Sequence, residues 1–92
     1  MTDKTEKPVV YNKNVVNRVS RSIGHLRAVK TMVENERDCS EVLVQLAAVK
    51  SEVNNAGKVI LKQYLEECLD VAVQEGNKQK IKEINLLIDR FL

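Results

Sequence analysis

The sequence predicts an all-α fold of three helices with a long central helix, on three observations. Aromatic residues are limited to Tyr11, Tyr64 and Phe91, and one proline and three glycines accompany 43% apolar and 30% charged residues. Apolar residues recur at steps of three and four along most of the chain, and residues 39–75 contain no proline. This pattern is typical of helices and excludes a β-sandwich, a barrel or a dinucleotide-binding α/β fold.

The first helix is predicted from about Asn14 to Asn35. Pro8 and its polar neighbours indicate a flexible arm over residues 1–12, so a single helical domain is expected over residues 13–92. After the arm, one apolar stripe with helical spacing is formed by Val15, Val16, Val19, Ile23, Leu26, Val29, Met32 and Val33.

The central helix is predicted over residues 39–75. Asp38, with Glu41 three residues later, makes a capping-box pattern of the kind that starts a helix. The apolar residues then keep a helical period as far as Leu69. Gly57 lies inside this helix and costs about 1 kcal/mol relative to alanine. It marks a weak point, a close approach of another backbone, or simple tolerance.

The third helix follows a stop at Gly76–Asn77 and runs to the C-terminus. A central helix of about 37 residues is about 55 Å long, whereas the first helix spans about 33 Å and the third about 20 Å. Neither one covers the apolar faces of the central helix fully. We therefore expect an antiparallel dimer in which two central helices pair, with the first helices alongside, as a four-helix bundle.

Charge is unevenly distributed, although the net charge is only +2. Residues 13–30 contain five basic residues and no acid, a local polycation suited to phosphate groups. Arg18, Arg21 and His25 fall at i, i+3 and i+7, which predicts one polar face opposite the valine stripe. A solvated basic face is the alternative interpretation. Three lysines of the central helix are candidates to extend the patch, but the sequence does not show which way they face: Lys50, Lys58 and Lys62.

The two cysteines, Cys39 and Cys68, are 29 positions apart, or about 43 Å along one helix. They cannot bond within one chain. If two central helices cross antiparallel near Val53 and Asn54, Cys39 of one chain lies beside Cys68 of the other. We find no signal-peptide pattern or apolar run of membrane length, so a cytoplasmic protein with reduced thiols is expected. Such thiols serve as ligands, as sensors or as small buried hydrophobes.

No catalytic motif stands out, and an enzyme is not expected. Two thiolates can hold a soft ion such as Cu(I), whereas a tetrahedral zinc site needs four ligands. His25, the single histidine, is far in sequence from both cysteines. Tyr64 stands four residues before Cys68, where a helix places a co-ligand on the same face, but tyrosine is a poor ligand for a soft metal.

Three segments, NRVSRSIGHL (17–26), DCSEVLVQLAAVKSEVNNA (38–56) and YLEECL (64–69), resemble the CsoR/RcnR family of copper- and nickel-sensing repressors over nearly the whole chain. The resemblance implies an all-helical DNA-binding repressor without a helix-turn-helix, a dimer of antiparallel bundles that assembles into a disc-like tetramer. It implies operator contacts by Arg18, Arg21 and Lys50. His25 stands where the family usually has glutamine, so a DNA contact by His25 is less secure.

Copper-sensing members bind Cu(I) with a cysteine at the Cys39 position of one subunit and a histidine and a cysteine, four residues apart, from the other. This chain has Tyr64 at the histidine position and Asp38 where a tyrosine is common, and both differences argue against copper. Members that keep both cysteines and lose the histidine are similar to the persulfide-sensing CstR branch, in which facing thiols form di- or polysulfide links.

The prediction is thus a homotetrameric repressor of operator double-stranded DNA, without a cofactor, that responds to persulfides or polysulfides through Cys39 and Cys68. A Cu(I)-sensing repressor using the same two thiols is the alternative. A general thiol-oxidation sensor and a purely structural helical dimer are further alternatives.

Overall fold

The computed structural model describes residues 10–92, and these form three α-helices and no strand. The helices are α1 (Lys13–Glu34), α2 (Cys39–Gln74) and α3 (Lys78–Phe91). The prediction of an all-α chain with a long central helix is confirmed, and each predicted boundary is within one residue of the observed one. Most of the predicted arm over residues 1–12 lies outside the described residues.

Helix α1 begins and ends at asparagines. The Asn12 side chain accepts a hydrogen bond from the Val15 N–H at 3.0 Å, which satisfies one of the free donors of the first turn. At the other end, Glu36 adopts a left-handed conformation with φ 54°. This conformation lets the Arg37 N–H reach back to the Met32 carbonyl at 3.0 Å and closes the helix.

Helix α2 begins after Asp38, as predicted, but the capping box is incomplete. The Asp38 carboxylate accepts from the Ser40 N–H at 3.1 Å and from the Ser40 hydroxyl. The Glu41 carboxylate, which a capping box would direct to Asp38, instead pairs with the Arg37 side chain at 3.0 Å. The cap therefore depends on Asp38 and Ser40, and Glu41 stabilises the preceding turn.

The turn between α2 and α3 contains Gly76 with φ 64°, the left-handed stop predicted there. Asn77 then caps α3 by accepting from the Lys80 N–H at 3.0 Å. Because the turn is short, α3 folds back at once along the helix it has just left.

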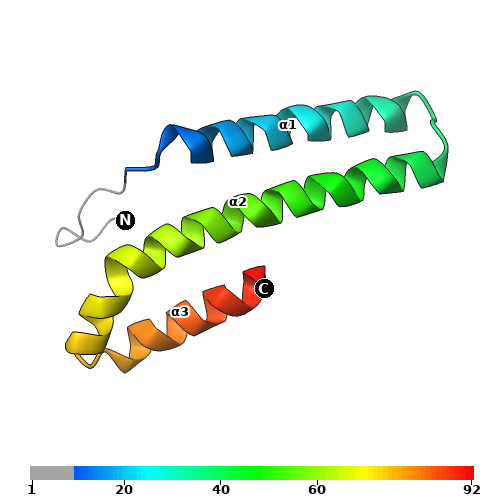
Figure 1. Ribbon diagram of the computed structural model, residues 1–92. Coiled ribbons are helices and arrows are strands. Elements are labelled where there is room, and N and C mark those ends of the chain that lie inside the picture. The colour runs from blue at the N-terminus through cyan, green and yellow to red at the C-terminus, as the bar shows by residue number, and fades with distance from the viewer. Residues whose placement is uncertain (1–9) are drawn as a thin grey trace.

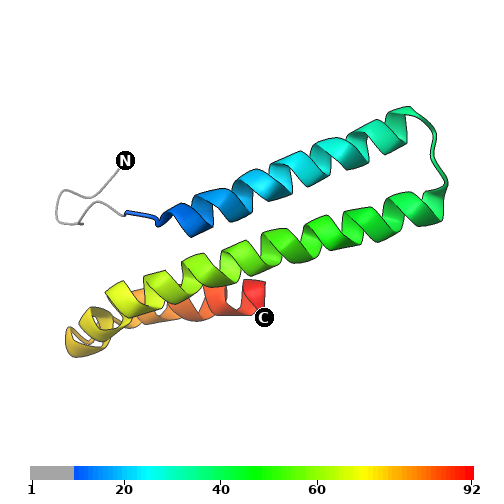
Figure 2. The ribbon, with the colours of Figure 1, turned by 45° about the horizontal axis from the view of Figure 1, so that its top comes forward.

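The long α2 is the scaffold of the molecule (Figure 1). Helix α1 runs antiparallel along its N-terminal half, and α3 returns along its C-terminal half (Figures 1 and 2). Among the described residues, α1 and α3 do not pack on each other. The result is an elongated molecule of 54 × 24 × 22 Å, whose longest dimension is the length of α2.

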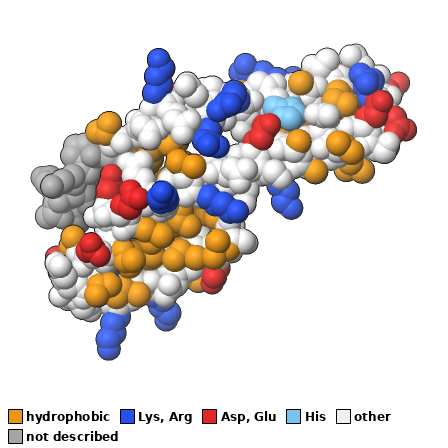
Figure 3. Space-filling view, viewed as in Figure 1, with side chains coloured by type: hydrophobic (Ala, Val, Ile, Leu, Met, Phe, Trp, Pro, Cys, Tyr) orange, Lys and Arg blue, Asp and Glu red, His pale blue; other side chains and the backbone are white. Residues whose placement is uncertain are grey.

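The core of one chain is small. Only six apolar side chains in the described part are buried: Val15, Val29, Val49, Ala56, Ala72 and Ile84. The stripe predicted on α1 divides in two, because Val15 and Val29 pack against α2 whereas its other valines, Ile23 and Leu26 are 41–58% exposed. A further apolar area covers α3 and the adjacent part of α2 (Figure 3). One chain alone therefore leaves much of its apolar surface in water.

Gly57 of α2 lies against the end of α3. A Cβ atom built on this residue would overlap the ring of Phe91 near the end of α3. The close approach considered from the sequence is thus present, although a side chain makes it and not a backbone. No helix in residues 10–92 has the length and apolar character needed to cross a bilayer.

Candidate functional site

Cys39 is the first residue of α2, and its side chain is exposed. The neighbouring Asp38 holds the helix start through its hydrogen bonds to Ser40, and these bonds lower the pKa of the Asp38 carboxyl, the one from the Ser40 side chain most strongly. An exposed thiol at the positive end of a long helix is accessible to soft metals and to sulfur electrophiles.

Cys68 lies at the other end of α2 and is half-buried. Tyr64, one turn earlier, is also half-buried, and the Lys80 ammonium group of α3 lies 5.4 Å from the centre of its ring. Lys80 is also 3.8 Å from the Glu83 carboxylate. A positive charge from α3 is therefore held over the ring of Tyr64, one turn before Cys68, and no sequence pattern predicted this contact.

The structure does not bring Cys39 and Cys68 together within one chain, as predicted. They stand 29 residues apart on one continuous helix, about 43 Å along its axis. Within residues 10–92 no three side chains of His, Cys, Asp or Glu form a group that would hold a metal ion. Two thiols suit Cu(I) by their chemistry, so a shared ligand requires Cys39 and Cys68 from different chains.

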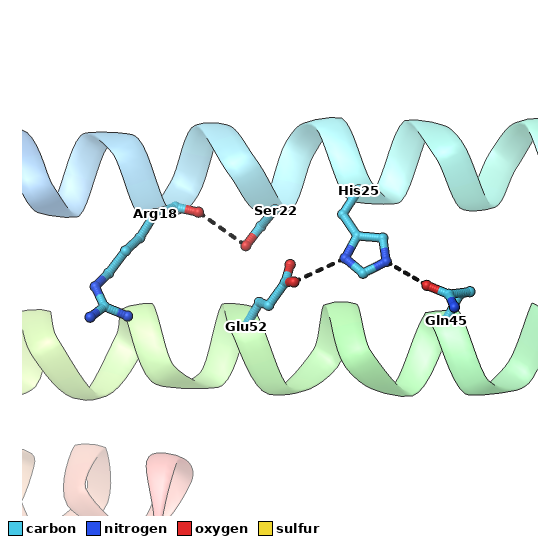
Figure 4. A network of polar contacts seen from close by, with 5 residues as sticks. All are labelled: Arg18, Ser22, His25, Gln45 and Glu52. Carbon is cyan, nitrogen blue, oxygen red and sulfur yellow. Dashed lines mark hydrogen bonds and ion pairs between the residues drawn. The ribbon is translucent and has the colours of Figure 1, made fainter.

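The residues of the predicted basic face of α1 do not all point the same way in the structure. Arg21 is exposed, whereas Arg18 and His25 point toward α2 (Figure 4). Between them lies Ser22, which is buried and donates its hydroxyl to the Arg18 carbonyl at 3.1 Å. The Arg18 Nε atom is buried and lacks a hydrogen-bond partner in the described part of the chain. We call Arg18, Ser22 and His25 the polar seam.

The expected arrangement of this face opposite the valine stripe is wrong for Arg18 and His25. The polar seam and the exposed stripe that contains Val19, Ile23 and Leu26 have the same spacing of three and four residues, displaced by one position. The seam faces α2 of its own chain, and the exposed stripe lies beside it. Polar residues thus occupy part of the contact within the chain while apolar residues stay uncovered.

His25 bridges the two helices. Its Nδ1 lies 3.0 Å from Glu52 Oε1 and its Nε2 lies 2.9 Å from Gln45 Oε1, both on α2 (Figure 4). The hydrogen bond to Gln45, followed by that to the Glu52 carboxylate, raises the pKa of His25. Gln45 and Glu52 were not singled out from the sequence, although their spacing of seven residues places them on one helix face.

An apolar groove runs beside the polar seam. Lys50 is exposed at its edge, together with Leu26, Leu43 and Leu46. Farther along, the groove is lined by Val19, Ser22, Ile23, Val49, Val53 and Ala56. The groove therefore places exposed apolar residues of α1 and α2 next to the basic residues of α1. Lys and Arg side chains also project from the outer edge of α1 (Figure 3).

The family of metal-sensitive transcriptional repressors matches residues 11–90, which include all three helices. The chain belongs to this family. Membership confirms the resemblance to the CsoR/RcnR family and identifies the chain as a transcriptional repressor, a class distinct from enzymes.

Two named relatives illustrate the match. The copper-sensing transcriptional repressor CsoR of Bacillus subtilis is 32% identical over 78 residues, which are 84% of this chain and 77% of that protein. The copper-sensing repressor CsoR of Mycobacterium ulcerans is 38% identical over 74 residues, 80% of this chain and 62% of that longer protein. The chain thus spans less than two thirds of the second relative.

Among solved structures, the nickel-responsive regulator InrS aligns with a TM-score of 0.71 and 41% identity, covering 94% of this chain and 98% of that one. The CsoR repressor with Cu(I) from Geobacillus thermodenitrificans aligns with a TM-score of 0.76 and 29% identity, covering 91% and 93%. These relatives are named for copper and nickel. They agree with the copper-sensing alternative better than with the persulfide prediction, and they do not bear out the CstR branch.

Proposed function

We propose that the chain represses transcription as an oligomer and releases operator DNA when an effector joins Cys39 of one subunit to Cys68 of another. The observation that carries this proposal is the placement of the only two thiols 29 residues apart on one helix. A second chain, running antiparallel and crossing near Val53 and Asn54, would bring each Cys39 beside a Cys68. Two equivalent sites would then form by twofold symmetry.

The apolar groove supports assembly with a second copy. It carries exposed residues of both α1 and α2, among them Ile23, Leu26 and Leu43, which a bundle would bury. The antiparallel four-helix dimer proposed here, paired further into a tetramer as the resemblance implies, covers this surface with its own equivalent. Dilution of the protein should therefore lower its helical content or thermal stability.

Operator binding is assigned to Arg18, Arg21 and Lys50. Arg21 and Lys50 are exposed, and Arg18 is half-buried in the polar seam. Residues 13–30 contain no acidic residue, which favours the approach of α1 to DNA, because carboxylates there would repel the phosphate groups. We place DNA on this basic side of α1, with Lys50 contributing from α2.

Cu(I) is the effector that the named relatives favour. Thiolates are soft ligands, and two of them facing each other across a subunit boundary suit a soft monovalent ion. When bound, Cu(I) would join Cys39 of one chain to Cys68 of the next and fix their relative position. The fixed position would disfavour the subunit arrangement that binds DNA. The effector site and the DNA-binding surface would thus be coupled.

Reactive sulfur is the second candidate, favoured by Tyr64. This residue occupies the position at which the resemblance expects a histidine ligand, and its ring lies under the Lys80 ammonium group. Each thiolate would attack the outer sulfur of a persulfide and expel its thiol, leaving Cys39 and Cys68 as persulfides. Attack of one on the inner sulfur of the other then gives a trisulfide and releases hydrosulfide.

Intact mass spectrometry separates the two effectors. The reduced protein is treated with Cu(I), with an organic persulfide and with peroxide, and its mass is measured under native and under non-reducing denaturing conditions. Copper retained only in the native spectrum supports Cu(I) sensing. A covalent dimer with one added sulfur atom per link supports reactive-sulfur sensing, and equal cross-linking by peroxide indicates a general thiol sensor.

Complementation tests the shared site itself. Chains with Cys39→Ser and chains with Cys68→Ser each lack both complete sites when assembled alone. Mixed dimers regain one site, formed by the remaining Cys39 and Cys68 of different chains. Loss of effector response in each variant and its partial return on mixing are expected. Response by either variant alone contradicts the proposal.

A further inference from the structure

His25 bridges α1 and α2, although neither the proposed effector site nor the DNA-binding surface requires this residue. Its two ring nitrogens contact Glu52 and Gln45, which stand seven residues apart on the face of α2 that meets α1. The His25 side chain is 26% exposed, so the bridge lies at the edge of the helix contact. One ring thus joins α1 to two residues of α2 that lie two helical turns apart.

The chemistry of the bridge favours the protonated ring. Both contacting atoms of α2 are oxygens, so an imidazolium donates to both. Glu52 on α2 is the charged group that contacts the ring, and Arg21 and Arg18 lie one and two turns earlier on α1. The Glu52 carboxylate favours the positive charge of the protonated ring.

We propose that His25 is a positioning residue, which fixes the rotation and register of α1 on α2 and thereby the direction in which Arg21 meets operator DNA. This inference depends on the proposed DNA-binding function. It replaces the direct DNA contact that was considered for His25 from the sequence.

The geometry opposes a direct contact. Both ring nitrogens are already engaged with α2, so a phosphate oxygen would have to displace Gln45 or Glu52. The Glu52 carboxylate at 3.0 Å from Nδ1 would also repel a phosphate brought to the same ring. Arg21 is exposed and has no such neighbour among the contacts of the described residues.

Substitutions at His25 and Glu52 distinguish a positioning role from a direct DNA contact, because the two roles predict opposite changes in operator affinity for Glu52→Gln. His25→Ala removes the bridge from α1, and Glu52→Gln weakens it from α2 while deleting one negative charge. For a positioning residue, both variants bind operator about two- to fivefold more weakly, the double variant is no weaker than His25→Ala, and the salt dependence is unchanged. Glu66→Gln, the same charge change at an exposed site elsewhere on α2, leaves affinity unchanged.

A direct contact gives the reverse result. Glu52→Gln then binds DNA more tightly, since a carboxylate near phosphate is gone, and His25→Ala lowers the slope of log affinity against log salt by about 0.9 per contact. Either observation overturns the proposal. The probe is the tightest duplex that the wild-type chain selects from a randomised library, measured by fluorescence anisotropy.

A second measurement does not depend on DNA. Because His25 is the only histidine, its imidazole signals in NMR report one titration, and Glu52→Gln is expected to lower the pKa of His25. An unchanged pKa shows that the bridge does not form and overturns the inference by itself. If the wild-type chain selects no duplex, the proposed function fails instead, and the positioning role toward DNA fails with it even where the NMR shift shows the bridge.

Discussion

The aromatic ring of Phe91 on α3 lies where a Cβ atom of Gly57 on α2 would be. The carbonyl of Phe91 also accepts a hydrogen bond from the Asn54 side chain at 3.4 Å, one turn earlier on α2. Together these contacts hold the end of α3 against the middle of the long helix. The glycine therefore defines where α3 docks.

Gly57→Ala is expected to destabilise the protein by about 1–3 kcal/mol, because the added methyl group forces the Phe91 ring out of its position. Thermal or urea unfolding measures the change. Gly24→Ala on α1 is the control, since a Cβ there meets nothing within 4 Å and alanine stabilises a helix by about 1 kcal/mol. In a Phe91→Ala background, Gly57→Ala should lose its cost, and a cost that persists there would exclude this explanation.

Asp38 should stabilise the protein only when it is ionised. Its pKa is lowered in the folded chain by the hydrogen bonds from Ser40, so its contribution is present above the ordinary value of 3.8 and is lost as the pH falls through the lowered pKa. Asp38→Ala is expected to lower Tm at pH 7 by about 4 °C or more.

Asp38→Asn keeps an oxygen acceptor for the cap and is the matched control for Asp38→Ala. It should retain most of the stability at pH 7 and lose less than the wild type on acidification to pH 3. Equal acid sensitivity of the two proteins would show that another carboxylate is responsible. Circular dichroism melting curves at several pH values measure both effects.

The contribution of His25 to stability should change with pH in the direction opposite to that of Asp38. Its pKa is raised from 6.5 in the folded chain, so its contribution to stability is full below pH 6.5 and is lost as the pH rises through the raised value. The difference in Tm between wild type and His25→Ala should therefore shrink between pH 6 and pH 9. A difference that is constant over this range would mean that the bridge does not depend on the proton.

Tyr64→His should strengthen Cu(I) binding. The substitution places an imidazole one turn before Cys68 on the same helix face, and a third ligand should raise affinity by at least the roughly tenfold that outer-shell partners alone contribute. Competition with a chromophoric Cu(I) chelator measures the gain. Tyr64→Phe keeps the ring without adding a ligand and should bind Cu(I) like the wild type. A similar gain in both variants would point to the loss of the hydroxyl.

Arg21→Ala should weaken operator binding at low salt more than at high salt. Each lost phosphate contact lowers the slope of log affinity against log salt by about 0.9. Arg90→Ala removes the same charge from the last turn of α3 and should leave the slope nearly unchanged. Equal effects of the two substitutions would indicate that only net charge matters and that α1 has no special role.

The helix ends were predictable because they depend on local chemistry. Asp38 caps the first turn of α2 within its own segment, and Gly76 adopts the left-handed conformation that glycine tolerates best. Glu36 shows the limit of this reasoning. It takes a positive φ without being glycine, and no glycine or proline near it in the sequence marks this position.

The facing of α1 was not predictable from periodicity. Two stripes displaced by one residue have the same spacing, and hydrophobicity alone selects the one with Ile23 and Leu26 as the inner face. The chain instead turns Ser22 and His25 toward α2, where Gln45 and Glu52 supply partners. Those partners lie 20 and 27 residues from His25 in the sequence, so no local pattern identifies them. Lys80 over Tyr64 is a tertiary contact of the same kind.

The uncovered groove between α1 and α2 also bears on how much repressor a cell would hold. A newly made chain presents Ile23, Leu26 and Leu43 to water until another copy arrives, and such surface is what chaperones and proteases recognise. Unpaired chains would then be removed faster than assembled ones. Turnover would set a threshold of synthesis below which the regulated genes escape control, whatever the concentration of the effector.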